Sequence, residues 1–191
     1  MTAAPALASF RLRPHPQTPC MLVDELVVQL ALTAPGVLTV LYTLRGAIDR
    51  LRIPTAAAPL DPERLWANTC CELFIAPAQG DAYVEWNFSP SGQLTRFAFS
   101  AYRQRMPSPP PVVATPEVSL LEHELRISAR IPLGDDAPLE LRIAPTAVVE
   151  DAGGSLSYWA LRHRPDRPDF HHEAGFALVL TAGLPIAIVQ R

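Results

Sequence analysis

The sequence predicts an all-β fold, an antiparallel β-sandwich of the jelly-roll or immunoglobulin-like kind, with about ten strands. Short apolar segments with period-two alternation recur along the chain at roughly regular spacing. Proline is abundant, at 21 of 191 residues against roughly 5% in average proteins, and most prolines lie between the apolar segments. Almost no segment shows helical periodicity. With no internal repeat or linker, we expect a single domain over residues 1–191 with its core at about residues 20–181.

The first half of the chain contains five predicted strands. The segment DPERLW (residues 61–66) interrupts them with one helical turn, in which Asp61 is the N-cap and Pro62 occupies the first helical position. The segment YVEWNF alternates between apolar and mixed polar residues, and the turn SPSG (residues 89–92) ends it. The five predicted strands cover residues 20–32, 37–45, 70–76, 83–88 and 93–103.

The second half continues the same pattern. Residues 106–111 (MPSPPP) are too rich in proline for a sheet interior and are predicted to be a loop. Residues 124–131 alternate clearly, since Leu125 and Ile127 face one way while Arg126 and Ser128 face the other. Residues 164–173 (RPDRPDFHHE) form a long polar loop. The predicted strands cover residues 116–121, 124–131, 139–149, 155–163, 176–181 and 186–189.

Charge and composition exclude several function classes. The formal net charge is -3, from 19 acidic and 16 basic residues, which gives no reason to expect a nucleic-acid or anionic-membrane partner. No stretch reaches the roughly 20 apolar residues that a membrane span needs. The N-terminus lacks a basic leader followed by an apolar segment, so a cytoplasmic protein is expected. The three cysteines are odd in number and unevenly spaced, which argues against a disulfide framework, and the lack of a CxxC pair argues against a zinc-thiolate site.

The three central strands each divide into two rows of side chains. The rows predicted to face the core are Cys71, Leu73 and Ile75, then Val84, Trp86 and Phe88, then Thr95, Phe97, Phe99 and Ala101. The opposite rows place Glu72, Glu85, Asn87 and Arg96 on one face if the strands are neighbours. That face is either solvated surface with a cross-strand ion pair or the lining of a ligand site.

Two tryptophans bear on this choice. Trp66 lies just before the strand that carries Glu72, and Trp159 shares a face with Ser157, Leu161 and His163. Aromatic faces stack on the C–H groups of sugars, while carboxylates and guanidinium groups bond to the hydroxyls. The alternative is that Trp159 belongs to the core and Trp66 covers an edge.

Three segments of the chain resemble a known family. LWANTCCELFIAP, YVEWNFSPSGQLTRFAFSAYR and YWALRHRPDRPDFHHEAGFALVL look like the DOMON-like domains of bacteria, which are similar to family-nine carbohydrate-binding modules and to haem-binding DOMON domains. The resemblance covers about residues 20–181 and implies a β-sandwich. In the carbohydrate modules two Trp clamp a sugar that Glu and Arg hydrogen-bond, which corresponds here to Trp66, Trp159, Glu72 and Arg96. Those modules also carry structural calcium, for which this sequence shows no matching acidic cluster.

The haem-binding relatives imply a different ligand. They hold a b-type haem between an axial Met and an axial His, and the candidates here are Met106 and His163. The segment His171-His172-Glu173 is the densest cluster of ligand-type side chains. Adjacent His171 and His172 point apart in an extended chain, so a polar loop that partly covers the Trp159 face is expected there rather than a metal site.

Enzyme motifs are absent from the sequence. No GxSxG, P-loop, GxGxxG or HExxH occurs. Glu72 and Glu85 have the residue types of a glycosidase pair, but such a pair needs a carboxyl group with a raised pKa, which the sequence does not indicate. We therefore expect a non-catalytic domain, without cofactor or metal, that binds a small polar ligand, preferably a sugar. The predicted ligand-binding residues are Trp66, Glu72, Glu85, Asn87, Arg96, Trp159 and His163. The alternatives are a b-type cytochrome domain and a protein-interaction module.

Overall fold

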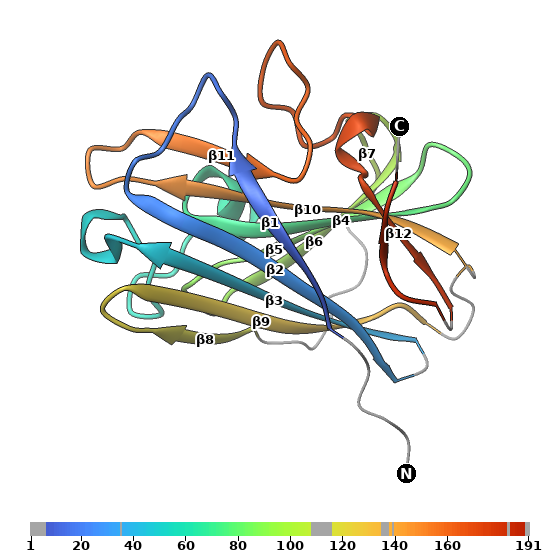
Figure 1. Ribbon diagram of the computed structural model, residues 1–191, viewed down its shortest axis with the longest axis horizontal. Helices are drawn as coiled ribbons and strands as arrows, with labels where there is room; N and C mark the ends of the chain where they lie inside the picture. The colour runs from blue at the N-terminus through green and yellow to red at the C-terminus, as the bar shows by residue number, and fades with distance from the viewer. Residues whose placement is uncertain are drawn as a thin grey trace.

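The fold is known from a computed structural model that describes residues 7–34, 36–107, 116–134, 138, 140–182 and 184–189. Within these residues, thirteen strands form one unclosed antiparallel sheet that folds into two layers (Figure 1). The predicted all-β sandwich is confirmed. Residues 108–111 of the predicted proline-rich loop, Leu139 at the start of a predicted strand, and residues 1–6 and 190–191 of the predicted domain lie outside the described residues.

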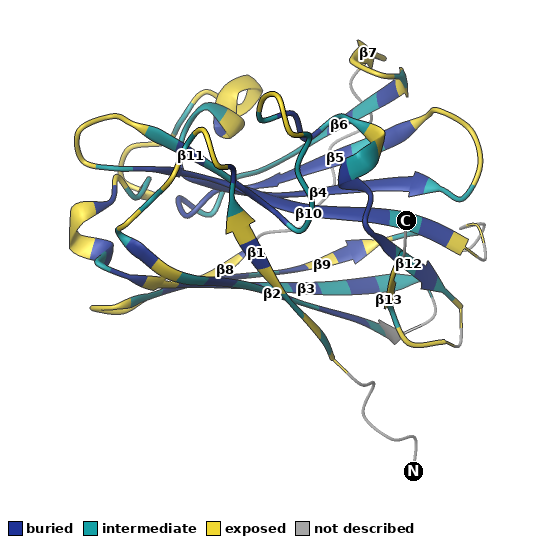
Figure 2. Cartoon of the chain, turned by 45° about the horizontal axis from the view of Figure 1, so that its top comes forward, coloured by how far each residue is buried: buried dark blue, intermediate teal, exposed yellow. Residues whose placement is uncertain are grey.

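The two layers face each other with their buried sides, as Figure 2 shows. Three short 3-10 helices lie at the ends of strands: η1 (Ile48–Arg50), η2 (Pro62–Ala67) and η3 (Glu173–Gly175). One layer contains β2 (Val23–Ala34), β3 (Val37–Gly46), β9 (Glu124–Pro132) and β8 (Glu117–Leu120). The other contains β7 (Gln104–Arg105), β6 (Leu94–Ala101), β5 (Tyr83–Phe88), β4 (Cys70–Pro77), β10 (Glu140–Glu150) and β11 (Leu156–Ala160), with β12 (Leu178–Thr181) and β13 (Ala187–Ile188) beside β10.

A strand that the sequence analysis did not predict connects the layers. β1 (Ala8–Pro14) pairs with β2 through residues 8–12 and with β11 through Arg13 and Pro14. Its side chains alternate between buried and exposed, and Leu12 belongs to the core. The sequence analysis did not predict this strand, because arginines make one of its faces polar and a proline ends it. The packed core thus begins before residue 20.

The main core fills the space between the layers. Leu26, Val28 and Leu30 of β2 pack there with residues of β4 and β5 that include Leu73 and Trp86. The predicted core rows of β4 and β5 are therefore confirmed. Tyr42 of β3 also crosses the core, because its hydroxyl donates a 2.6 Å hydrogen bond to the backbone carbonyl of Glu72.

A second apolar cluster lies on the outer face of the β4–β5–β6 layer. Its aromatic members are Phe74, Tyr83, Phe97, Phe99, Phe170 and Phe176. The strand register pairs Glu85 with Phe97 and Trp86 with Arg96. The prediction that Phe97 and Phe99 face the main core is therefore wrong. The loop that carries Phe170 covers these aromatics, so the outer face of this layer is buried as well, and the more apolar row of β6 lies on that face.

Two local predictions are confirmed. The carboxylate of Asp61 accepts a 3.0 Å hydrogen bond from the Glu63 N–H and caps η2, with Pro62 in the first turn. At the turn between β5 and β6, the N–H of Gly92 donates to the carbonyl of Ser89 at 3.0 Å, and Gly92 has a φ of 83°, which favours glycine. In the described part of the chain, no helix has the length and apolar character that crossing a bilayer requires.

Candidate functional site

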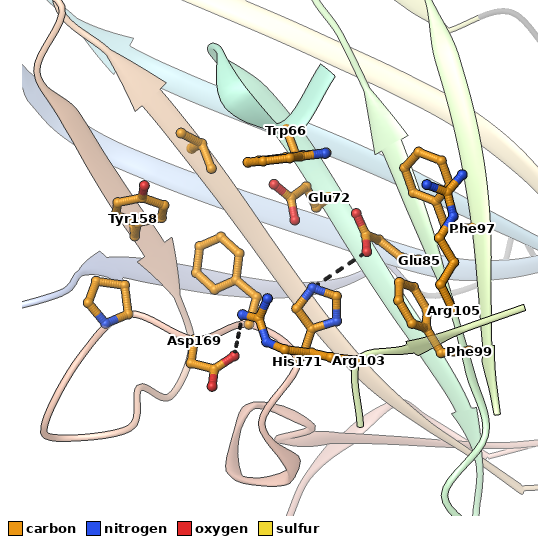
Figure 3. A pocket seen from close by; sticks show the side chains of 13 residues that line it. Trp66, Glu72, Glu85, Phe97, Phe99, Arg103, Arg105, Tyr158, Asp169 and His171 are labelled. Carbon is orange, nitrogen blue, oxygen red and sulfur yellow. Dashed lines mark hydrogen bonds and ion pairs between the residues drawn. The ribbon is translucent and has the colours of Figure 1, made fainter. Parts of the chain in front are cut away.

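A cavity of about 510 Å³ lies on the outer face of the β4–β5–β6 layer (Figure 3). This volume is typical of small-ligand pockets. β4 and β5 form its floor, η2 and the β6–β7 turn form two walls, and the loop before η3 forms another. Its aromatic lining is Trp66, Phe97, Phe99, Tyr158 and Phe170. Its titratable lining is Glu72, Glu85, Arg103, Arg105, Asp169 and His171, and Val148 and Pro168 complete it.

A row of polar side chains crosses the sheet at this floor. The register pairs Glu72 with Thr146 of β10 on one side and with Asn87 of β5 on the other, and Asn87 pairs with Thr95 of β6. Glu85 shares a face with Asn87, two residues away. The prediction that Glu72, Glu85 and Asn87 share one face is confirmed. Among the described residues, the buried hydroxyls of Thr95 and Thr146 have no hydrogen-bond partner.

Glu85 is held in place by its neighbours. The amide of Asn87 donates a 2.7 Å hydrogen bond to Glu85 Oε1, and His171 Nε2 lies 3.8 Å from Glu85 Oε2. The Asn87 carbonyl oxygen lies 3.8 Å from the Cys70 thiol, which donates to it. Burial raises the pKa of Glu85, and the Asn87 hydrogen bond and the charges of Arg103 and Arg105 only partly offset this rise.

Glu72 has a different environment. Only 3% of its surface is exposed, yet within the described part of the chain no group donates a hydrogen bond to its carboxylate. Burial, and then the negative charge of Glu85, raise the pKa of Glu72 well above its ordinary value. The floor thus combines Glu72, whose raised pKa favours the protonated form, with Glu85, which accepts a hydrogen bond from Asn87. The raised pKa that a glycosidase pair requires is therefore present at Glu72, which the sequence did not indicate.

Asp169 fixes the loop wall of the cavity. Tyr102 donates a 2.7 Å hydrogen bond to Asp169 Oδ2, and Arg103 Nη2 lies 2.9 Å from Asp169 Oδ1 (Figure 3). Burial would raise the pKa of Asp169, but these hydrogen bonds outweigh it, so the pKa lies below its ordinary value. Asp169 is therefore ionised at neutral pH and ties the loop to the turn that carries Arg103.

His171 connects this loop to the floor. The backbone N–H of Arg103 donates to the Tyr83 hydroxyl oxygen at 3.0 Å, and this hydroxyl lies 2.8 Å from His171 Nδ1. We assign Tyr83 as the donor to Nδ1, which leaves the ring proton on Nε2, facing Glu85. Burial and then the charge of Arg103 lower the pKa of His171 to about 4. His171 is therefore neutral at pH 7.

Trp66 lies at the mouth of the cavity. Its indole N–H donates to the Glu63 carbonyl at 3.1 Å, and 47% of its surface is exposed. Figure 3 shows its ring over Glu72. Arg105 lies at the same rim, with its guanidinium 4.1 Å from the centre of the Phe97 ring and 2.7 Å from Glu63 Oε2. The cavity therefore presents an exposed aromatic face above buried carboxyl groups.

Two predicted site residues lie elsewhere. Arg96 lies on the Trp86 face of the sheet, 5.3 Å from that ring, so its predicted position beside Glu85 is wrong. Trp159 is a core residue with 3% of its surface exposed, and its indole N–H donates to Ser157 Oγ at 3.0 Å. The alternative that Trp159 belongs to the core is confirmed. The neighbouring residue Tyr158, on the opposite face of β11, lines the cavity instead.

The two haem-ligand candidates are not brought together in this cavity. His163 Nε2 lies 2.8 Å from the Arg13 carbonyl, and its ring meets that of His15 edge-on at 5.0 Å. Met106 follows the edge strand β7, with its N–H bonded to the Ala98 carbonyl. Neither lines the cavity, so these residues do not fit axial ligation of a haem there. Within the described ranges, no group of three or more His, Cys, Asp or Glu side chains is arranged to hold a metal ion.

The sequence analysis missed several residues of the cavity. Arg103 is the last residue of the predicted strand 93–103 and Arg105 lies beyond it, but β6 ends at Ala101 and the chain turns back there into β7. Asp169 and His171 were expected only as part of a polar loop covering the Trp159 face. The loop instead covers the opposite face of the layer, where Tyr158 lies, so the prediction that it covers the Trp159 face is wrong. A signal for Tyr158 existed in its own alternation, since Leu156, Tyr158 and Ala160 form the second row of that strand.

Comparisons with known proteins bear on the fold alone. No family model matches the chain. No curated protein matches it either. One similar solved structure, from Bacteroides uniformis ATCC 8492, is described as a "putative carbohydrate-binding protein". It superposes with a TM-score of 0.65 at 17% sequence identity, over 89% of this chain and 85% of that chain. At this identity the likeness shows a shared β fold.

Proposed function

We propose that this protein binds a small carbohydrate, without catalysis, in the cavity beneath Trp66. One observation carries the proposal: a half-exposed indole face lies above a floor of buried carboxyl groups. Sugars present an apolar C–H face to aromatic rings and hydroxyl groups to carboxylates. The fold that this chain shares with the Bacteroides protein, described as a "putative carbohydrate-binding protein", supports the same ligand class.

The resemblance to DOMON-like domains is part of this proposal in a modified form. Trp66 and Glu72 keep the roles that the resemblance implies. Tyr158 takes the place proposed for Trp159, and Arg103 and Arg105 take the place proposed for Arg96, because these are the side chains that line the cavity. We assign the positioning of Glu85 to Asn87 and give His163 no part in the site.

Calorimetric titration with a panel of monosaccharides and disaccharides tests the proposal. Trp66→Ala removes the exposed stacking face, so we expect affinity for any bound sugar to fall by about 1–3 kcal/mol, on the scale of losing a buried aromatic contact. Leu120→Ala is the matched control, since Leu120 is an exposed apolar residue of β8 in the other layer. Equal affinity of both variants and the wild type would contradict the site. Release of reducing sugar during the titration would instead make the cavity an active site.

A further inference from the structure

In the described part of the chain, neither acid at the floor of the cavity has an ion pair with an arginine. Glu72 and Glu85 lie on one sheet face, in the register that pairs Glu72 with Asn87 and Phe74 with Glu85. Each is at least nine-tenths buried, with 3% and 4% of its surface exposed. Two carboxylates in such a place repel each other and lose hydration, unless a positive charge or a proton lies between them.

The cationic side chains near the floor already have acidic partners. Arg103 pairs with Asp169 at 2.9 Å, and Arg105 pairs with Glu63 at 2.7 Å. His171, the other basic group facing Glu85, is neutral because its pKa is lowered to about 4. Four further titratable neighbours have raised pKa values and are therefore neutral as well: Cys70, Cys71, Tyr42 and Tyr83.

Glu72 gives a second, independent indication of a missing ligand group. Its carboxylate lines the cavity, and no group of the described residues donates a hydrogen bond to it. The acceptor thus opens only to the cavity, where a donor from a ligand can bond to it. The aromatic rings of Trp66, Tyr158 and Phe170 surround the same space, and such rings favour cations placed near their faces.

We infer that the ligand is a sugar carrying a protonated amine, whose ammonium group binds between Glu72 and Glu85 while its ring stacks on Trp66. This inference rests on the proposed function and narrows its ligand class. In the free protein a proton on the Glu72–Glu85 pair takes the place of the missing cation. The ammonium group displaces that proton, so binding releases a proton to solvent and weakens as the pH falls.

Matched sugars test the inference on the wild-type protein. The probes are glucosamine, galactosamine and mannosamine, each compared with its parent hexose and its N-acetyl derivative by calorimetry at pH 7. We expect the amine to bind about 10- to 100-fold more tightly than the neutral sugars, the scale of a hydrogen bond to a charged group. Titrations in two buffers with different ionisation enthalpies should show proton release.

Two variants assign the preference to Glu72. Glu72→Gln keeps the size of the side chain and should bring the amine and the parent hexose to within about threefold of each other, since the amide cannot pair with an ammonium group. Glu117→Gln, an exposed acid of β8 in the other layer, should keep the wild-type preference. Equal or tighter wild-type binding of a neutral sugar overturns the amine inference and leaves the proposed function intact. Absence of binding to every sugar, amino or neutral, overturns both.

Discussion

The Glu72 carboxyl group is buried against Glu85, and in the described residues it has no hydrogen-bond donor, so its ionisation costs free energy in the folded state. Because its pKa is raised on folding, its contribution to stability is fully present below the unfolded value of about 4.5 and is lost as pH rises towards the folded value. Each unit of such a shift corresponds to about 1.4 kcal/mol. A binding residue of this kind therefore reduces the stability of the protein at neutral pH.

Relative to the wild type, Glu72→Gln should therefore raise the free energy of unfolding more at pH 8 than at pH 4. The amide has no proton to lose, so the variant escapes the loss of stability that begins in the wild type once Glu72 ionises in the unfolded chain. Urea denaturation at both pH values measures the difference. Glu117→Gln controls for the loss of one acid from the chain, since Glu117 is exposed. The same change in stability at pH 4 and pH 8 would count against the burial argument.

At the scale of elements, the loop wall of the cavity depends on one acid. Asp169→Asn weakens the contacts with Tyr102 and Arg103, and Arg103 loses its ionic partner. We expect a loss of about 1–3 kcal/mol in the free energy of unfolding, with faster amide exchange over residues 164–177. Asp166→Asn is the matched control in the same loop, because Asp166 is half exposed and pairs with Arg164 on the surface. Equal exchange rates in the two variants would show that Asp169 does not anchor the loop.

The strands show which parts of this arrangement a sequence predicts. Alternation identified the two faces of β4 and β5 because one row of each is plainly apolar, and this placed Glu72 and Glu85 together. In β6 the same reasoning failed, because Phe97 and Phe99 are apolar yet pack on the outer face beneath the loop. When both faces of a layer are buried, alternation still separates the two rows of side chains. It does not tell which row faces the other layer. The choice between Trp159 and Tyr158 depends on the same distinction.

On the scale of the whole molecule, the main core and the site lie on opposite faces of one layer. The core between the layers holds β4 and β5 in place, partly through the Tyr42 hydrogen bond to the backbone of Glu72. The outer face carries the buried carboxyl groups of the site, those of Glu72, Glu85 and Asp169. The site residues on strands are thus fixed by packing that a ligand does not touch, as precise binding requires. Glu72 and His171, two groups with shifted pKa values, lie on this outer face.

Two groups on that face give opposite pH dependences. The lowered pKa of His171, about 4 against 6.5 when unfolded, contributes stability that is present above pH 6.5 and lost as pH falls to about 4. The raised pKa of Glu72 makes stability fall as pH rises above about 4.5. The sum of the two contributions to the free energy of unfolding has its maximum between about pH 4.5 and 6.5. Denaturant unfolding across pH 4 to 8 should show that maximum. Glu72→Gln should move it to higher pH and His171→Gln to lower pH, and unchanged profiles in both variants would show that neither group sets it.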